Sequence, residues 1–286
     1  MISGLMLGVL YALMGLGISF IYGVMRMINW SMGEFFMIAG YVQLVFVALL
    51  GPSLWLASVP LSLAVIFLVG LLTQRFVLKP TFTTIGERRD EYIVIVTIAI
   101  SVLLKNLVVV FAGPYIYKVP DYLPSFTVSG VIVSGNRLAA AIVAIAAIVL
   151  FFAMLKYTWV GMALRATAQH RFASQTLGVD IWRIDNYAFG IGVTLAGVAG
   201  VMLAPVFLVY PESGVVPAIK GFVILVIGGL GSLVGSLVSG ILLGLAESLG
   251  TALIDPRYRE VYGFLLLILI LLVRPLGLFG KAEREV

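Results

Sequence analysis

The sequence contains no cysteine, one histidine and few charged residues. Without cysteine, the chain has no disulfide, no thiolate metal site and no cysteine nucleophile. Charged residues make up 11% of the chain and hydrophobic residues make up 62%. This balance leaves too little polar surface to cover a soluble globule. The composition therefore predicts an integral membrane protein.

Motifs that would supply a reaction or its energy are also missing. The phosphate-loop pattern GxxxxGK[ST] does not occur, and the nearest string, GLFGKA at 277–282, has the wrong spacing and lacks the hydroxyl. The histidine, His170, stands apart from any HExxH or carboxylate pattern, and no GxSxG string occurs. We therefore expect that the chain is not an enzyme, binds no metal and holds no cofactor of its own.

Long apolar segments recur along the chain. Each has about 20 residues, enough for a helix to cross the hydrocarbon core of a membrane. The alternating pattern of a membrane β-barrel is absent from the sequence, which leaves helices as the spanning structure. The first segment lacks the basic start of a signal peptide, so we expect it to be a retained span. The expected spans are at about 2–25, 32–50, 53–74, 92–112, 138–155, 187–209 and 258–273.

Residues 218–253 are also apolar, but GGLGSLVG at 228–235 interrupts them. Their length suits two short spans better than one. The predicted fold is an all-α polytopic membrane bundle that forms one domain over residues 1–286. It has nine spans, or eight if the glycine-rich stretch is a re-entrant break.

The distribution of Lys and Arg predicts the orientation in the membrane. These residues concentrate at Arg26 and in 75–89, 156–183 and 274–284. Short cytoplasmic loops collect Lys and Arg, and nine spans with the N-terminus outside put all four groups in the cytoplasm. The net charge of +5 is therefore explained by orientation. Because this charge is spread over separate loops, it does not form the basic face of a nucleic-acid-binding protein.

One sizeable external loop is expected at 113–137. Three prolines argue against a helix, and FTVSGVIV at 126–133 predicts a short hairpin with its turn near Ser129 and Gly130. This loop either covers the outer ends of the helices or offers a contact surface to an extracytoplasmic partner.

Three ionisable residues, Glu34, Lys105 and Glu247, lie inside predicted spans. Ionisable side chains in a membrane usually face a bundle interior or a water path, so these residues are candidates for the translocation path or its gate. Glu34 and Lys105 could instead reach an interface by snorkelling. A second candidate is the glycine cluster, which either exposes backbone to a cavity or forms a tightly packed turn. Its members are Gly228, Gly229, Gly231 and Gly235.

A polar island at 156–186 lies between two spans, so we interpret it as a structured loop at the cytoplasmic surface. Residues 161–177 have helical spacing, with Leu164, Ala168 and Phe172 repeating every four residues.

Gly178 suits a left-handed cap at the end of this helix. Arg165 and Gln169 share another face of the helix, which would be offered to a cytoplasmic protein. The alternative is a helix that only anchors in lipid headgroups.

Four segments, in this order, resemble the permease subunits of branched-chain amino acid ABC importers of the LivH type. They are GISFIYGVMRMINWSMGEFFMIAGY (17–41), the GMALRATAQ to LGV island (161–179), GGLGSLVGSLVSGILLGLAE (228–247) and RPLGLFG (274–280). The likeness covers nearly the whole chain. The chain departs from the family's usual NxxHGE-like string, where it has Asn29, Met32, Gly33 and Glu34, and has Leu276 in place of a usual glutamine.

The resemblance implies a multi-pass subunit of a bacterial inner membrane, with a cytoplasmic C-terminus. It would pair with a second, homologous permease, with two cytoplasmic ATPases that bind ATP and Mg²⁺, and with a periplasmic protein that delivers leucine, isoleucine or valine. We expect a coupling element that comprises Gly161, Arg165, Ala166, Gln169 and Gly178. The candidates for the path or gate are Asn29, Glu34, Gly228, Gly229, Gly231 and Glu247.

The alternative function is a secondary transporter or channel for a small polar solute such as urea or an amide, acting without ATPases. Such transporters are expected to have two halves with matching interrupted helices. The sequence has one strong interruption and no convincing repeat, so it favours the importer.

Overall fold

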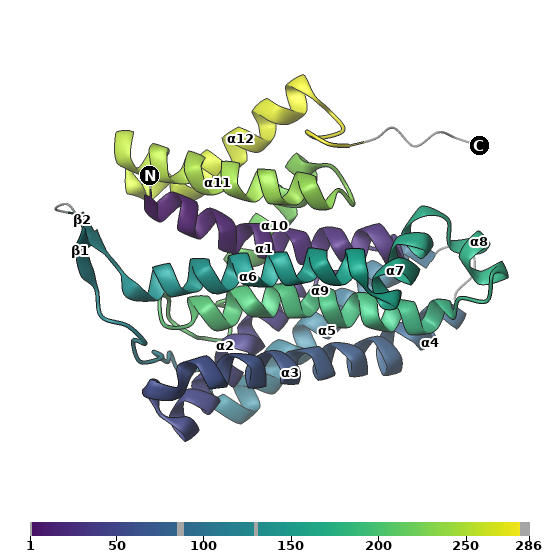
Figure 1. Cartoon of the computed structure of the whole chain (residues 1–286), viewed down its shortest axis with the longest axis horizontal. Helices are drawn as coiled ribbons and strands as arrows, with labels where there is room; N and C mark the ends of the chain where they lie inside the picture. Colours follow the sequence, from purple (N-terminus) through teal and green to yellow (C-terminus); the bar gives the residue numbers. More distant parts are fainter. Residues whose placement is uncertain (1, 85–88, 129–130, 281–286) are drawn as a thin grey trace.

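The chain folds as a bundle in which most helices lie along one long axis (Figure 1). The computed structural model describes residues 2–84, 89–128 and 131–280. The long helices are α1 (Ile2–Met25), α2 (Met32–Leu50), α3 (Trp55–Thr73), α5 (Arg89–Ala112), α6 (Gly135–Tyr157), α9 (Ile181–Leu203) and α11 (Leu233–Leu253). The shorter helices are α4 (Lys79–Thr84), α7 (Trp159–Gln169), α8 (Arg171–Thr176), α10 (Val215–Gly228) and α12 (Arg259–Val273). The other elements are η1 (Pro52–Leu54), η2 (Gln74–Leu78), η3 (Pro256–Tyr258) and the strands β1 (Phe126–Val128) and β2 (Val131–Val133).

Helices α1 and α9 form the centre of the bundle. Helix α1 packs against α6, α9, α10 and α11, and α9 also packs against α2 and α3. Both helices are apolar on most sides and are largely buried, as expected for helices surrounded by other helices. Seven of the described helical segments are long and apolar enough to cross a membrane. The predicted polytopic helical bundle is therefore confirmed.

Glycines allow α1 and α11 to pack with their backbones in contact. A Cβ atom added at Gly244 would lie 2.4 Å from the Cα atom of Gly8, and one added at Gly240 would lie 2.4 Å from the Cα atom of Ala12. Small residues let helices approach closely. The face of α11 that carries Gly240 and Gly244 therefore packs directly on the backbone of α1.

Two non-helical segments return into the bundle. Residues 26–31 lead from the end of α1 to the start of α2, where Met32 lies against Gly17. Gly17 precedes the last residue of α1 by eight positions, and the Cε atom of the Met32 side chain reaches back along α1 to it. Residues 204–214 likewise lead from the end of α9 back to Gly214, which packs against Gly33 at the start of α2. Helix α10 therefore begins inside the bundle.

The bundle has two different ends (Figure 1). One end, called the hairpin end below, carries the start of α1 and the strands β1 and β2, which pair antiparallel. The other end carries the short helices α7 and α8 and the C-terminal segment 274–280, and it is called the α7–α8 end below. The predicted hairpin at 126–133 is confirmed, while its predicted turn at Ser129 and Gly130 lies outside the described residues.

The predicted division of 218–253 into two helices is confirmed by α10 and α11. The predicted span at 187–209 is wrong at both ends. Helix α9 begins six residues earlier, because the Asp180 carboxylate accepts hydrogen bonds from backbone N–H groups of its first turn. It ends at Leu203, shortly before Pro205, which has no N–H group to donate. The span predicted at 53–74 continues as a helix through η2 and α4.

Candidate translocation pocket and coupling surface

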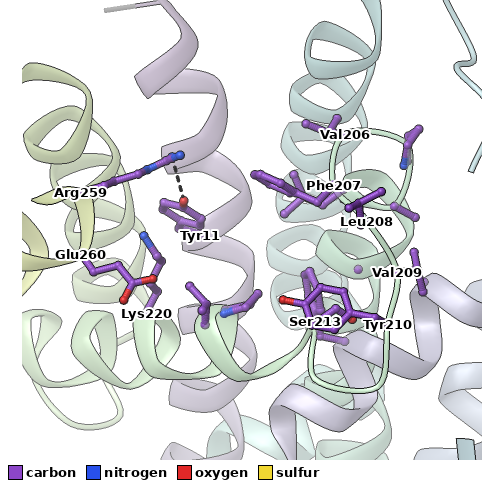
Figure 2. A pocket seen from close by; sticks show the side chains of 18 of the residues that line it. Tyr11, Val206, Phe207, Leu208, Val209, Tyr210, Ser213, Lys220, Arg259 and Glu260 are labelled. Atoms are coloured by element: carbon purple, nitrogen blue, oxygen red, sulfur yellow. Dashed lines mark hydrogen bonds between the residues drawn. The ribbon is translucent and has the colours of Figure 1, made fainter. Parts of the chain in front are cut away.

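A cavity of about 760 Å³ lies between α1, α10, α12 and the segment 204–214 (Figure 2). It lies towards the hairpin end, because residues of η3 and Lys118, in the segment before β1, contribute to its lining. The return of 204–214 into the bundle, together with the late start of α10, leaves this space. Its lining includes Tyr11, Phe36, Gly40, Lys118, Val206, Phe207, Leu208, Val209, Tyr210, Ser213, Val216, Lys220, Arg257, Arg259 and Glu260.

One wall of the cavity is a buried charged cluster around Glu247, which is 2% exposed. The Lys220 ammonium donates to Glu247 Oε1, and the Arg259 guanidinium donates to Glu247 Oε2 at 3.0 Å. Tyr11 joins the two, because its hydroxyl donates to Glu247 Oε2 at 3.4 Å and accepts from Arg259 at 3.1 Å. Buried charges require such partners, so the cluster holds each side chain in one orientation.

Sequence reasoning selected Glu247 but missed Tyr11, Lys220 and Arg259. Lys220 carried a usable signal, since it is a cation within an apolar stretch. Tyr11 carried no such signal, because its contact with Glu247 joins residues that are 236 positions apart.

Two other candidates, Asn29 and Glu34, lie at the start of α2 and do not line the cavity. Asn29 is 1% exposed. Its Oδ1 accepts two hydrogen bonds from Ser31, one from the backbone N–H at 3.0 Å and one from the side-chain hydroxyl at 2.7 Å. Within the described part of the chain, Asn29 Nδ2 and Glu34 Oε2 are buried and have no hydrogen-bond partner.

Lys105 on α5 contacts the returning segment 204–214. Its ammonium lies 2.5 Å from Glu212 Oε1, and the two side chains are 40% and 62% exposed. The Lys105 hydrogen bond and charge lower the pKa of Glu212 below the ordinary range of a glutamate. Among residues 2–84, 89–128 and 131–280, no three His, Asp or Glu side chains are grouped so that they could hold a metal ion.

The glycine cluster forms the turn between α10 and α11 at the α7–α8 end. Gly229 and Gly231 have φ angles of +95° and +76°, a region that favours glycine. The C-terminal segment packs on this turn, and the N–H of Leu278 donates to the carbonyl of Ile227 at 2.8 Å. A Cβ atom at Gly229 would lie 2.4 Å from the backbone nitrogen of Gly280. These glycines do not line the cavity.

The helix predicted at 161–177 is instead two helices, α7 and α8, so the prediction of one continuous helix is wrong. The chain breaks at His170, whose backbone is extended and whose Nδ1 accepts a hydrogen bond from the N–H of Ala173 at 3.1 Å. The imidazole therefore caps α8, and this cap redirects the chain. Phe172 is consequently 72% exposed and does not continue the buried face of Leu164.

The predicted coupling residues lie on or beside an exposed surface. Arg165, Ala166 and Gln169 are exposed on α7, and the Arg165 guanidinium donates to the carbonyl of Leu155 in the last turn of α6. Gly161 is buried, and a Cβ atom there would lie 2.4 Å from the Leu155 carbonyl oxygen. The absence of a side chain at Gly161 therefore lets α7 fold back on α6.

Gly178 ends α8 with a φ of +87°, and its N–H donates to the carbonyl of Gln175 at 3.0 Å. The predicted left-handed cap is confirmed. Large apolar side chains are also exposed on this part of the chain, namely Tyr157, Trp159, Met162, Phe172 and Leu177. Such a group of exposed apolar residues is typical of a surface that contacts another protein or lipid headgroups.

An ion pair that the sequence did not reveal connects α8 to the core. The Arg171 guanidinium donates to Asp185 Oδ1 at 2.9 Å and also to Oδ2, and it reaches the carbonyl of Val24 at 3.3 Å. Asp185 belongs to α9 and is completely buried, and Val24 belongs to the last turn of α1. Arg171 therefore joins the α7–α8 surface to both central helices.

The family described as "Branched-chain amino acid transport system / permease component" matches residues 1–273. The chain is 32% identical to the high-affinity branched-chain amino acid transport system permease protein LivH of Salmonella typhimurium, covering 100% of this chain and 96% of that protein. It is 31% identical, with the same coverage, to the corresponding protein BraD of Pseudomonas aeruginosa. It is 27% identical to a probable LivH of Methanocaldococcus jannaschii over 95% of this chain and 89% of that protein. No solved structure matches the chain.

These matches confirm the resemblance that the sequence motifs indicated. They extend over the helices that form the cavity and over the α7–α8 surface alike. The chain belongs to the permease family of branched-chain amino acid transport systems.

Proposed function

We propose that this chain is a transmembrane permease subunit of an ATP-driven importer for branched-chain or related amino acids. The observation that carries the proposal is the match to branched-chain amino acid permeases over the full chain. The fold supports it, because a cavity near one end and an exposed helical surface at the other are the two features that such a subunit requires.

In this proposal the α7–α8 end faces the cytoplasm and the hairpin end faces the outside. Support comes from the charges, since Arg26, Lys156 and Arg274 all lie towards the α7–α8 end and Lys and Arg favour the cytoplasmic side. The C-terminal segment then lies in the cytoplasm, and the membrane is the bacterial inner membrane.

Two cytoplasmic ATPases, which bind ATP and Mg²⁺, dock on the α7–α8 surface through Arg165, Ala166, Gln169 and the exposed apolar side chains around them. Closure of the ATPases moves α7. Gly161 and the Arg165 hydrogen bond pass that movement to α6, and Arg171 passes it to α9 and α1.

A second, homologous permease completes the translocation path. We place it on the face that carries the start of α2 and the Lys105–Glu212 pair, because an exposed ion pair on a face in contact with lipid would be costly. The buried polar atoms of Asn29 and Glu34 that lack partners within the described chain belong to the same helix start. Gly228, Gly229 and Gly231 stay candidates for a gate at the α7–α8 end.

A periplasmic binding protein delivers the amino acid to the hairpin end. The segment 113–137 is suited to this contact, because its described part lies beside the cavity through Lys118. The residue identities do not select leucine, isoleucine or valine over related amino acids, since the binding protein makes the first selection.

The test is to copurify the tagged chain with the products of neighbouring reading frames and to reconstitute the complex in vesicles. We expect two ATP-binding subunits and a second permease to copurify, and leucine uptake to require ATP and the binding protein. An isolated homodimer that transports urea or an amide without ATP would overturn the proposal and favour a channel or secondary transporter. A complex with an inactive ATPase supplies the control for passive leakage.

A further inference from the structure

The cavity at the hairpin end has two chemically different walls (Figure 2). The charged wall holds Lys220, Arg259 and Glu260, with Tyr11 beside them. Lys220 and Arg259 both donate to Glu247, which does not line the cavity. The opposite wall is apolar and comes from the returning segment, with Val206, Phe207, Leu208 and Val209 labelled in Figure 2.

The charges around the cavity do not balance. Four cations line it, namely Lys118, Lys220, Arg257 and Arg259, and one anion, Glu260, faces them. Glu247 adds a second negative charge behind the wall, where it is shared between two of the cations. The set therefore carries a net charge of about +2 at neutral pH, by the ordinary charges of these groups.

The buried Glu247 carboxylate positions the cations without neutralising them both. It accepts from Lys220 and Arg259 at once, so those three side chains together keep one positive charge. The Tyr11 hydroxyl completes the arrangement, because it bonds both Glu247 and Arg259. Fixed donors of this kind suit an anionic group, which gains charge-assisted hydrogen bonds.

We propose that this cavity binds the amino-acid cargo itself, with the cargo's carboxylate at Lys220 and Arg259 and its aliphatic side chain against 206–209. The cargo's ammonium then lies towards Glu260. This inference rests on the proposed function, because it assumes that the cargo is an aliphatic amino acid. The volume of about 760 Å³ falls within the range of about 300–1,000 Å³ that is usual for small-molecule sites.

The absence of cysteine makes a direct test possible, since a single introduced cysteine is the one thiol on this chain. Ser213→Cys places a thiol in the lining of the cavity. Ser53→Cys places a matched thiol on the exposed η1 helix, which does not line the cavity. Each variant is prepared in the full transporter complex in nanodiscs, and its reaction rates with a negatively and a positively charged methanethiosulfonate of similar size are measured. The complex with the native chain gives the background from the other subunits.

We expect the ratio of the anionic to the cationic rate to be about tenfold higher at position 213 than at position 53, because a positive cavity concentrates anions. Lys220→Gln should lower this ratio at position 213, and Lys220→Arg should restore it. The conservative variant keeps the test valid if Lys220→Gln reduces the yield of complex. Equal ratios at the two positions, or a ratio that Lys220→Gln leaves unchanged, would overturn the inference.

Protection then identifies the bound group. Leucine and 4-methylpentanoate, which both carry a carboxylate, should slow the modification of Ser213→Cys, and leucinamide, which lacks one, should not. Equal protection by leucinamide would refute carboxylate recognition. If the charge ratio holds but leucine neither protects nor is transported, the proposed cargo is wrong and the inference fails with it. If leucine is transported normally and the charge ratio is absent, the inference alone fails.

Discussion

The Arg171–Asp185 pair offers the sharpest test of how the α7–α8 surface connects to the core. We consider Arg171→Gln, which removes the guanidinium from a completely buried carboxylate and also breaks its hydrogen bond to the Val24 carbonyl. Loss of one partner of a buried ion pair costs about 3–5 kcal/mol. We expect about 3 kcal/mol here, because the Arg171 side chain is 29% exposed and part of its interaction is therefore screened.

Arg171→Gln should also impair the coupling of ATP hydrolysis to leucine uptake in complexes that remain folded. In the proposed function, Arg171 passes movement from α8 to α9 and α1, so its loss should raise the number of ATP molecules hydrolysed per leucine imported. We expect ATPase activity to persist while uptake falls. The measurement is the ratio of phosphate release to leucine uptake in the same vesicles, with thermal unfolding of the complex followed in parallel.

A matched control lies nearby on the same stretch of chain. Arg183 pairs with Asp180 at 2.9 Å, but their side chains are 81% and 48% exposed. An exposed pair contributes about 0–1 kcal/mol, so Arg183→Gln should alter neither stability nor the ATP-to-leucine ratio measurably. A double-mutant cycle of Arg171→Gln with Asp185→Asn should give a coupling energy of about 2 kcal/mol. A coupling energy near zero, together with an unchanged ratio, would refute the assigned link.

Three further predictions concern single positions. Arg165→Glu should leave the chain folded, because Arg165 is exposed. Because Arg165 belongs to the proposed docking surface, the substitution should reduce leucine uptake more than ATP hydrolysis, and equal uptake in mutant and native vesicles would exclude Arg165 from coupling. Gly229→Ala should destabilise the complex by about 1–3 kcal/mol, because φ is +95° and the added Cβ would meet Gly280; an unchanged thermal midpoint would contradict this packing. Burial raises the pKa of Tyr122 to about 12, so the stability that the neutral phenol contributes should persist up to pH 10 and disappear as the pH rises through 12. Subtraction of the titration spectrum of the Tyr122→Phe variant isolates the ionisation of this phenol. An ionisation midpoint near the ordinary value of a tyrosine would disprove the burial.

The long helices could be predicted from the sequence because length and apolar composition determine which segments can cross a membrane. The division of 218–253 was also predictable, since glycines at positive φ end helices. The end of α9 was not. Residues 206–209 are apolar, and their hydropathy favours a continued span, although the chain there is a non-helical segment that lines a cavity.

The break at His170 escaped prediction for a related reason. The spacing of Leu164, Ala168 and Phe172 fits one helix. Nothing in that pattern indicates that the His170 imidazole will accept a hydrogen bond from the N–H of Ala173 and so begin a second helix. A side chain that bonds its own backbone competes with the helix locally, and this competition depends on geometry more than on periodicity.

The site residues divide in the same way. Glu247 could be found from scarcity alone, because a carboxylate within an apolar span requires an explanation. Its partners could not be assigned, since Tyr11, Lys220 and Arg259 come from three other helices and meet Glu247 only in the folded bundle. Contacts between residues so far apart in the sequence leave no local sequence pattern from which they could be predicted.

Helix α1 touches both functional regions. Tyr11 lies in the wall of the cavity, and the carbonyl of Val24 accepts a hydrogen bond from Arg171 at the other end of the bundle. These residues are 13 positions apart, which is about 20 Å along a helix at 1.5 Å per residue. Because α1 is buried among α6, α9, α10 and α11, it can shift along its axis only together with its neighbours. In the proposed function, a displacement of α8 by the ATPases would therefore reach the Tyr11 hydroxyl, and through it Glu247 and Arg259.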